Sequence, residues 1–305
     1  MDVTQWLLDS DPAIRWQVMR DVVGAPESIV AVERARVEHS GWGGRLLALQ
    51  GEDGHWGGGP YVVPGWTSTT DTLMTLRDFG LDPKSGPARE AIARMRAKKA
   101  SWGPEFDNVP FFDGEVEPYI NGRVLAAGAY FGVATTTPLD FLLDEQLPDG
   151  GWNCEASPGL KSSFHTTICV LEGLLEYERA VGGSARVGEA RRRGEAYMLE
   201  RRLFRRKSTG EVIDPNWLRF SFPTWYHYDV LRALDYLREA DVQPDERVEE
   251  AIGVVEGNRA PDGRWPLQNV HRGAAHIEMD DGEGTPSRWI TLRAMRVLDW
   301  AGRGK

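Results

Sequence analysis

A short motif, Asp-Gly-x-Trp, recurs along the sequence about once per helical hairpin, and it constrains the fold more than any other feature. Weaker copies of the motif surround Trp102 and Trp217. A fixed spacing of this kind is typical of repeat architectures, in which each copy is one structural unit that needs its neighbours. The three close copies are LLALQGEDGHWGGG (46–59), LLDEQLPDGGWNCE (142–155) and GNRAPDGRWPLQN (257–269).

An amphipathic segment follows each tryptophan after a loop. Within four of these segments, apolar residues recur at steps of three, as in Leu171, Leu174 and Tyr177, which predicts helices with one buried face. We expect the five tryptophans to be structural, each packing under the next helix while its N–H finds a carbonyl. The five segments span residues 69–80, 121–132, 165–177, 228–240 and 289–300.

More polar helical segments alternate with these apolar ones, at residues 85–99, 184–202 and 245–257. A hairpin of one apolar and one polar helix cannot bury both faces alone, so copies must stack. If the stack closes, apolar helices form an inner ring and polar helices an outer ring. The sequence therefore predicts an all-α fold: a single α/α toroid over residues 1–305, with N-terminal helices in 1–40 and repeats over about 41–300.

Composition excludes several classes of function. The net charge of −10 works against binding a polyanion, so nucleic acid is not an expected partner. The first residues carry acids where a secretory signal would carry bases, and no apolar run is long enough to span a membrane, so we expect a cytoplasmic protein. Two cysteines, Cys154 and Cys169, cannot make a disulfide framework and are interpreted as inert.

In a toroid, the N-termini of successive inner helices open onto one end of the cavity. Asp71, Glu117, His165 and His227 precede or begin such helices, so we predict that they approach one another there as catalytic residues. Caps at helix N-termini are the alternative role for the same residue types. Nearby aromatic residues would form an apolar, π-rich wall suited to a bulky hydrophobic substrate; the predicted substrate-binding residues are Trp66, Phe112, Tyr119, Trp225, Tyr228 and Trp289.

The segment Gln146–Trp152 reads Q-x-P-D-G-G-W, and Gln50–Trp56 reads Q-x-x-D-G-x-W. Both resemble the QW repeat of squalene and oxidosqualene cyclases, whose α/α architecture is shared by protein prenyltransferase beta subunits. The resemblance runs from about residue 40 to 300. It implies a toroid with a central cavity closed at one end, and this chain has the length of one barrel rather than two.

The chemistry of these cyclases depends on the middle aspartate of a D-x-D-D-T segment, which protonates an alkene. The closest segment here is STTDT, Ser68–Thr72. Aligned on the final threonine, Asp71 matches the last aspartate, and Thr70 stands where the acid would be. We therefore expect the chain to lack the proton donor of ordinary squalene cyclases at that position.

Protein prenyltransferase beta subunits offer a second template, because FHTTICVLEGL, Phe164–Leu174, is similar to their Y-H-T-x-Y-C-L-x-G-L segment. In this alignment, His165 occupies the position of the zinc-binding histidine of those subunits. One repeat earlier, Glu117 falls where the zinc aspartate would be, and Tyr119 where the cysteine would be. A carboxylate and an imidazole remain, and His227 is a candidate third ligand, so the resemblance implies a zinc site.

Three readings of function stay open. The favoured one is an enzyme acting on a terpenoid or prenylated substrate, with His165, Glu117 and His227 in acid–base or metal chemistry. The alternative is a non-catalytic toroid that binds a hydrophobic ligand or a protein partner. A third reading, paired carboxylates for glycoside chemistry, ranks below both. His39, His55 and His271 lie in polar loops and are expected at the surface.

Overall fold

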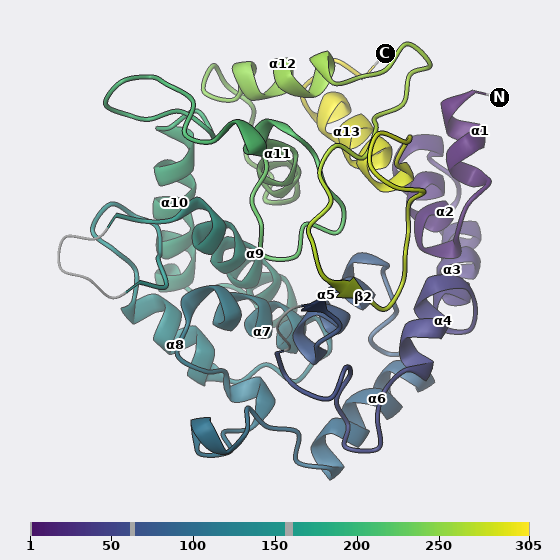
Figure 1. Cartoon of the computed structure of the whole chain (residues 1–305), viewed down its shortest axis with the longest axis vertical. Helices are drawn as coiled ribbons and strands as arrows, with labels where there is room; N and C mark the ends of the chain where they lie inside the picture. Colours follow the sequence, from purple (N-terminus) through teal and green to yellow (C-terminus); the bar gives the residue numbers. More distant parts are fainter. Residues whose placement is uncertain (1, 62–64, 156–160, 305) are drawn as a thin grey trace. The chain divides into compact units, whose positions relative to one another are not determined.

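The computed structural model describes residues 2–61, 65–155 and 161–304 (Figure 1). It consists mostly of α-helices, and the two strands among the described residues have two residues each, so the predicted all-α class is confirmed. The chain divides into two compact units: unit 1 comprises 1–42, 198–272 and 277–305, and unit 2 comprises 43–197 and 273–276. The expectation of a single closed domain stays a prediction.

Buried and half-exposed helices alternate in unit 2, as the sequence pattern predicts. Helix α7 packs between α5 and α9, and α8 packs on its outer side (Figure 1). Almost every residue of α5 and α7 is buried, whereas α6 buries one face. The helices of this unit are α5 (Thr69–Asp78), α6 (Gly86–Ala97), α7 (Pro118–Tyr130), α8 (Thr136–Asp144), α9 (Phe164–Val181) and most of α10 (Ala185–Leu199).

Two glycines bring α7 and α9 into close contact. A Cβ on Gly122 would lie 2.6 Å from the carbonyl oxygen of Cys169, and one on Gly173 would lie 2.3 Å from the carbonyl oxygen of Gly122. No larger residue fits at either position without moving a backbone. The backbones of α7 and α9 are therefore in direct contact around Gly122.

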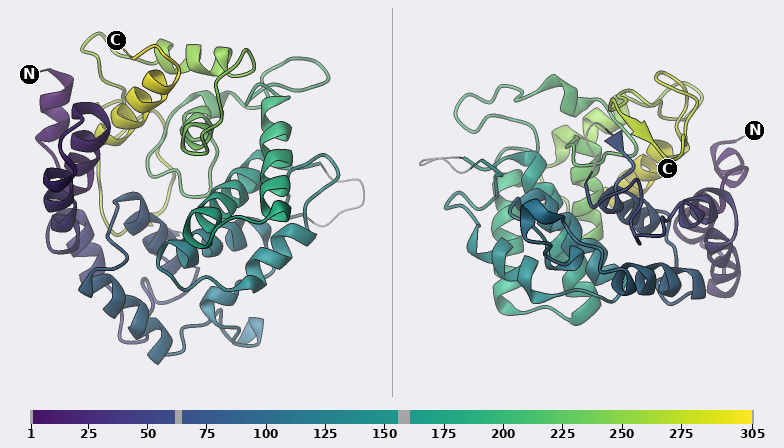
Figure 2. Two further views of the ribbon diagram at one scale, coloured as in Figure 1. Left: turned by 180° about the vertical axis from the view of Figure 1, so that it is seen from behind. Right: turned by 60° about the horizontal axis from the view of Figure 1, so that its bottom comes forward.

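Unit 1 contains the chain's first helices and its last. Helix α11 (Val230–Glu239) packs on α12 (Glu249–Gly257) and α13 (Arg288–Trp300), and α13 also packs on α2 (Pro12–Val18). Figure 2 shows α2 beside α3 (Glu27–Ala35), both in purple. Helix α1 (Val3–Leu8) packs on α2, and α4 (Gly41–Ala48) begins where the unit ends.

The predicted structural role is confirmed for the tryptophans of the three close copies of the motif. Trp56, Trp152 and Trp265 are at most 1% exposed. Each indole N–H donates a 2.7 Å hydrogen bond to the carbonyl ten residues earlier, on Leu46, Leu142 and Val255 respectively. The backbone N–H of each tryptophan donates to a threonine hydroxyl in the following buried helix, at 3.0–3.1 Å. Each tryptophan thus fastens the end of one helix to the start of the next.

The only strands among the described residues, β1 (Gly65–Trp66) and β2 (Ala274–Ala275), pair in parallel just before α5. The predicted substrate-binding residue Trp66 is half-buried in β1. A Cβ on Gly273 would lie 2.9 Å from its indole nitrogen, so the backbone at Gly273 packs closely against the Trp66 indole. This short pairing places Trp66 next to the N-terminus of α5.

Candidate functional site

The N-terminal turn of α5 carries the STTDT segment, and most of its side chains have structural partners. Ser68 caps the helix by accepting from the Asp71 N–H, and Thr69 accepts from the Trp56 N–H. The Thr70 hydroxyl donates to the carbonyl of Pro60 at 2.8 Å. Thr70 is 1% exposed, so its hydroxyl is held inside the fold.

Asp71 is completely buried, and both of its carboxylate oxygens are engaged. Oδ1 accepts from the guanidinium Nη2 of Arg123, on α7, at 2.7 Å, and Oδ2 accepts from the Ser68 hydroxyl at 2.7 Å. The Arg123 side chain is 2% exposed. A buried ion pair of this geometry joins α5 to α7 and loses its stabilising effect if one partner is removed. Asp71 therefore ties two helices together, which is a structural role beside the predicted catalytic one.

Glu117, Tyr119 and Cys154 lie together where α7 and α9 begin. Glu117 is the N-cap residue of α7, and the Tyr119 hydroxyl donates to the Tyr61 hydroxyl at 2.9 Å. Burial raises the pKa of the Cys154 thiol to about 11, the Glu117 charge adds to that rise, and the Thr166 hydroxyl, 3.5 Å from the sulfur, opposes it. A thiol with so high a pKa is a poor nucleophile. The inert reading of Cys154 is therefore supported.

His165 is the second residue of α9 and is half-buried, so it lies at the same end of unit 2 as Glu117. No group of three or more His, Cys, Asp or Glu residues within 2–61, 65–155 and 161–304 is arranged to hold a metal ion. The zinc site of Glu117, His165 and His227 stays a prediction. Within the same ranges, no helix is both long and apolar enough to cross a membrane.

A second polar cluster lies in unit 1, at the N-terminus of α11. Asp229 is the N-cap residue of this helix, and its Oδ1 accepts from the Arg232 N–H at 2.8 Å. Its Oδ2 accepts from the backbone N–H of Ser221 and lies 3.2 Å from the Ser221 hydroxyl oxygen. Arg232 Nη1 donates to the carbonyls of Trp225 and His227, which folds residues 221–229 back onto the helix. We call residues 221–229 the capping loop.

Asp229 is 3% exposed, and burial raises the pKa of its carboxyl. The N–H groups of Arg232 and Ser221 and the charges of Arg293 and Arg232 act in the opposite direction without cancelling that rise. A buried carboxyl whose pKa is shifted upward by desolvation is a candidate acid or base. The partners of Asp229 are backbone N–H groups and a hydroxyl, whereas Asp71 accepts directly from a guanidinium.

Ser221 connects Asp229 to His271. Its Oγ lies 3.2 Å from Asp229 Oδ2 and 3.1 Å from His271 Nε2, and it has one hydrogen to donate. If Ser221 donates to the carboxylate, His271 must donate its Nε2 proton to Ser221. If Ser221 donates to His271, the carboxyl must carry the proton. When His271 Nδ1 carries a proton in both arrangements, they differ by one proton moved along the line: imidazolium with carboxylate becomes neutral imidazole with carboxylic acid. We call this the 229–221–271 proton line.

Aromatic rings adjoin the outer end of this line. The His271 ring stacks on the His227 ring with centroids 3.7 Å apart, and His227 stacks on Tyr226 at 4.1 Å. Next to Ser221, Phe222 stacks on Trp289 at 4.4 Å. Of the predicted binding residues in unit 1, Trp225 is half-buried, whereas Tyr228 and Trp289 are 3% and 2% exposed and belong to the core.

Two expectations about surface histidines are wrong. His55 is 8% exposed, because its Nδ1 lies 2.8 Å from the Thr69 hydroxyl inside unit 2, and burial lowers its pKa. His271 is half-buried by the stacking and by Ser221. His39 is exposed, as expected. Sequence reasoning missed Ser221 and His271, because no spacing or motif relates them to Asp229.

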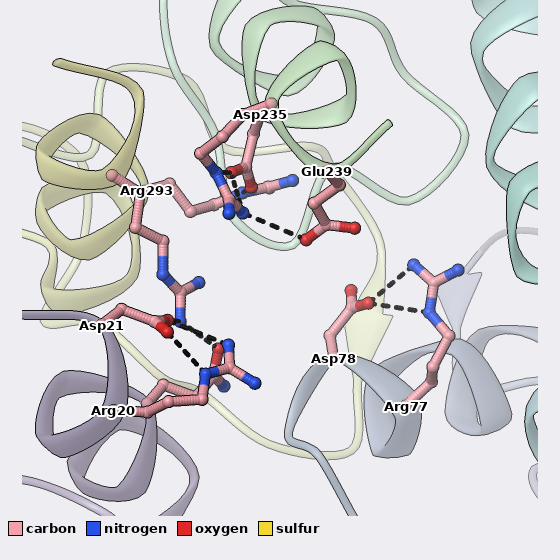
Figure 3. A network of polar contacts seen from close by, with 10 residues as sticks. Arg20, Asp21, Arg77, Asp78, Asp235, Glu239 and Arg293 are labelled. Atoms are coloured by element: carbon pink, nitrogen blue, oxygen red, sulfur yellow. Dashed lines mark hydrogen bonds and ion pairs between the residues drawn. The ribbon is translucent and has the colours of Figure 1, made fainter. Parts of the chain in front are cut away.

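At the opposite end of α11, ion pairs hold unit 1 together (Figure 3). Asp235 accepts from Arg238 and from Arg293 of α13, both at 2.8 Å. Burial would raise the Asp235 pKa, but the surrounding arginines outweigh it and lower the pKa. The same view shows Asp21 with Arg20 and, from unit 2, the pair of Arg77 and Asp78. Among them, the Asp235–Arg293 pair joins α11 to α13.

Solved structures of low identity resemble this chain. A type II terpene cyclase, MstE from Scytonema, is 18% identical, with a TM-score of 0.47 over 99% of this chain and 88% of that one. A variant of it, in complex with its substrate geranylgeranyl dihydroxybenzoate, is 17% identical, with a TM-score of 0.45 over 99% and 86%. A protein from Actinoplanes is 15% identical, with a TM-score of 0.44 over 96% and 90%.

No protein-family model matches the chain, and no curated protein matches it either. At the identities and TM-scores of the solved structures, the likeness carries no weight for the chemistry of this chain. The residues themselves have to support any function.

Proposed function

We propose that the chain is an enzyme that carries out acid–base chemistry on a bulky hydrophobic substrate of the terpenoid or prenylated class. The observation that carries the proposal is the 229–221–271 proton line, in which a buried carboxyl with a raised pKa is joined through one hydroxyl to a half-buried imidazole. Such a line can deliver a proton to a group bound beside His271 or remove one from it.

The surroundings of the line support the substrate class. Tyr226 and His227, both half-buried, extend the stack on His271. Aromatic faces bind apolar chains and stabilise positive charge. Protonation of a carbon–carbon double bond in a prenyl chain creates such a charge. The residues therefore fit an alkene substrate better than a polar one.

The test is proton exchange with solvent. We expect the protein, incubated in deuterium oxide with geranylgeraniol, to yield a product whose mass has increased by deuterium. His271→Ala and Asp229→Asn should each abolish that product. His39→Ala is the matched control, because His39 is an exposed histidine of the same unit and lies outside the cluster.

Three results bear against the proposal. Equal product from the His271 and His39 variants would exclude the proton line as the site. Tight binding of geranylgeraniol without conversion would favour the non-catalytic alternative. Loss of activity on treatment with a chelator would favour the zinc reading instead.

Because Thr70 replaces the acid, squalene should not give hopene-type products in this assay.

A further inference from the structure

Unit 2 contains a cavity that has no part in the proton line. Its volume is about 410 Å³, within the range of small-molecule sites. It lies between the C-terminal end of α6, the loop of residues 100–113 and the residues that follow α7. Val133 and Thr135 place it at the C-terminal end of α7, whereas Glu117 lies at the start of that helix.

The floor of the cavity is apolar and firmly held. Met95 and Phe111 are 2% and 1% exposed. Phe111 stacks on Trp102 with centroids 5.4 Å apart, and its carbonyl accepts from the Trp102 indole at 3.0 Å. Phe112 lies edge-on to Phe111, and its carbonyl accepts from Thr135. The cavity is therefore preformed and suited to an apolar chain.

The rim of the cavity is mainly cationic. Arg96 and Lys99 are both exposed lining residues, and neither has an ion-pair partner among the residues that the structure describes. Asp113, which is half-buried, is the one acidic residue in the lining. Two exposed cations above an apolar floor match a ligand that has an apolar body and one anionic end.

The backbone at Lys99 supports a role for its side chain. Helix α6 ends in a Schellman motif, in which the Ala100 N–H donates to the Met95 carbonyl, and Lys99 occupies the left-handed position at φ 53°. Glycine is the usual residue there, because it adopts this conformation without strain. A lysine in this conformation is strained relative to glycine, and its ammonium group lies at the rim of the cavity.

From this geometry we infer that the cavity binds a small free amphiphile, an apolar chain that ends in a carboxylate. The chain would lie on Met95, Phe111 and Phe112, and the carboxylate would lie between Arg96 and Lys99. This site is independent of the proposed acid–base function and does not require it.

Calorimetric titration with decanoate, below its micelle concentration, tests the inference. Decanoate should bind, and decanol, which lacks the charge, should bind roughly tenfold more weakly. Lys99→Gly should weaken decanoate binding by about threefold to tenfold while leaving the melting temperature unchanged or higher, because glycine relieves the strain. Lys98→Gln is the matched control: Lys98 is equally exposed but is not a lining residue, so binding should not change.

A cavity-filling variant, Val133→Phe, should remove decanoate binding altogether, since Val133 lines the same space. Equal affinity for decanol and decanoate would overturn the inference. So would unchanged binding in Lys99→Gly or Val133→Phe, or no binding of decanoate by the unaltered protein. Asp229→Asn should leave decanoate affinity unchanged, so that failure of the proton line and failure of this site are separate outcomes.

Discussion

Two buried aspartates at the starts of buried helices have opposite surroundings. Asp71, in the first turn of α5 in unit 2, meets the guanidinium of Arg123 and the Ser68 hydroxyl. Asp229, the N-cap of α11 in unit 1, meets backbone N–H groups and the Ser221 hydroxyl, with His271 beyond it. The comparison teaches that the nearest partner, rather than burial or helix position, separates a carboxylate that holds helices together from one that can exchange a proton.

The largest expected effect concerns the ion pair. Arg123→Met should destabilise the protein by about 3–5 kcal/mol, because it leaves the Asp71 carboxylate buried without its cation. Urea unfolding followed by circular dichroism measures this free energy. The double variant Asp71→Leu with Arg123→Met should recover most of the loss. If the single variant loses less than about 1 kcal/mol, Asp71 is not the structural carboxylate described here.

The two serines allow a matched comparison of the two sites. Ser68→Ala and Ser221→Ala each remove one hydroxyl from a buried aspartate and should each cost about 1 kcal/mol. Their effects on the deuterated product should differ, since only Ser221 lies in the proton line. Equal activity of the two variants would show that the line does not carry the proton.

A smaller effect on stability is expected for Asp229→Asn. Asparagine caps a helix about as well as aspartate, so the free energy of unfolding should change by only a few tenths of a kcal/mol. Activity should nevertheless be lost, because an amide cannot exchange the proton. A variant that unfolds readily but keeps its activity when folded would reverse the roles assigned to the two aspartates.

The smallest effect is the pH dependence that Asp229 confers. Its pKa is raised in the folded chain, so its protonation stabilises the fold. That contribution is complete below the unfolded pKa of about 4 and is lost as the pH rises through the folded pKa. The free energy of unfolding of the unaltered protein, relative to Asp229→Asn, should therefore fall with rising pH. A difference that stays constant between acid and neutral pH would contradict this.

The repeat and its periodicity predicted the helices and the burial of the tryptophans, because both depend on residues near one another in sequence. The same pattern placed Glu117 and His165 at helix starts. It could not predict that Arg123 reaches Asp71, since an ion pair between helices depends on side-chain direction. Nor could it predict the burial of His271. That burial arises because the loop of His271 packs on the loop of His227, forty-four residues earlier in the sequence.

The indole hydrogen bonds of Trp56, Trp152 and Trp265 have a consequence for how the chain acquires its fold. Each hydrogen bond closes a loop of only ten residues, so it can form before distant parts of the chain come into contact. Contacts of such short sequence separation carry a small loop-closure entropy and favour rapid formation. The chain can therefore begin folding at any of three places, and an error in one hairpin need not spread to the others.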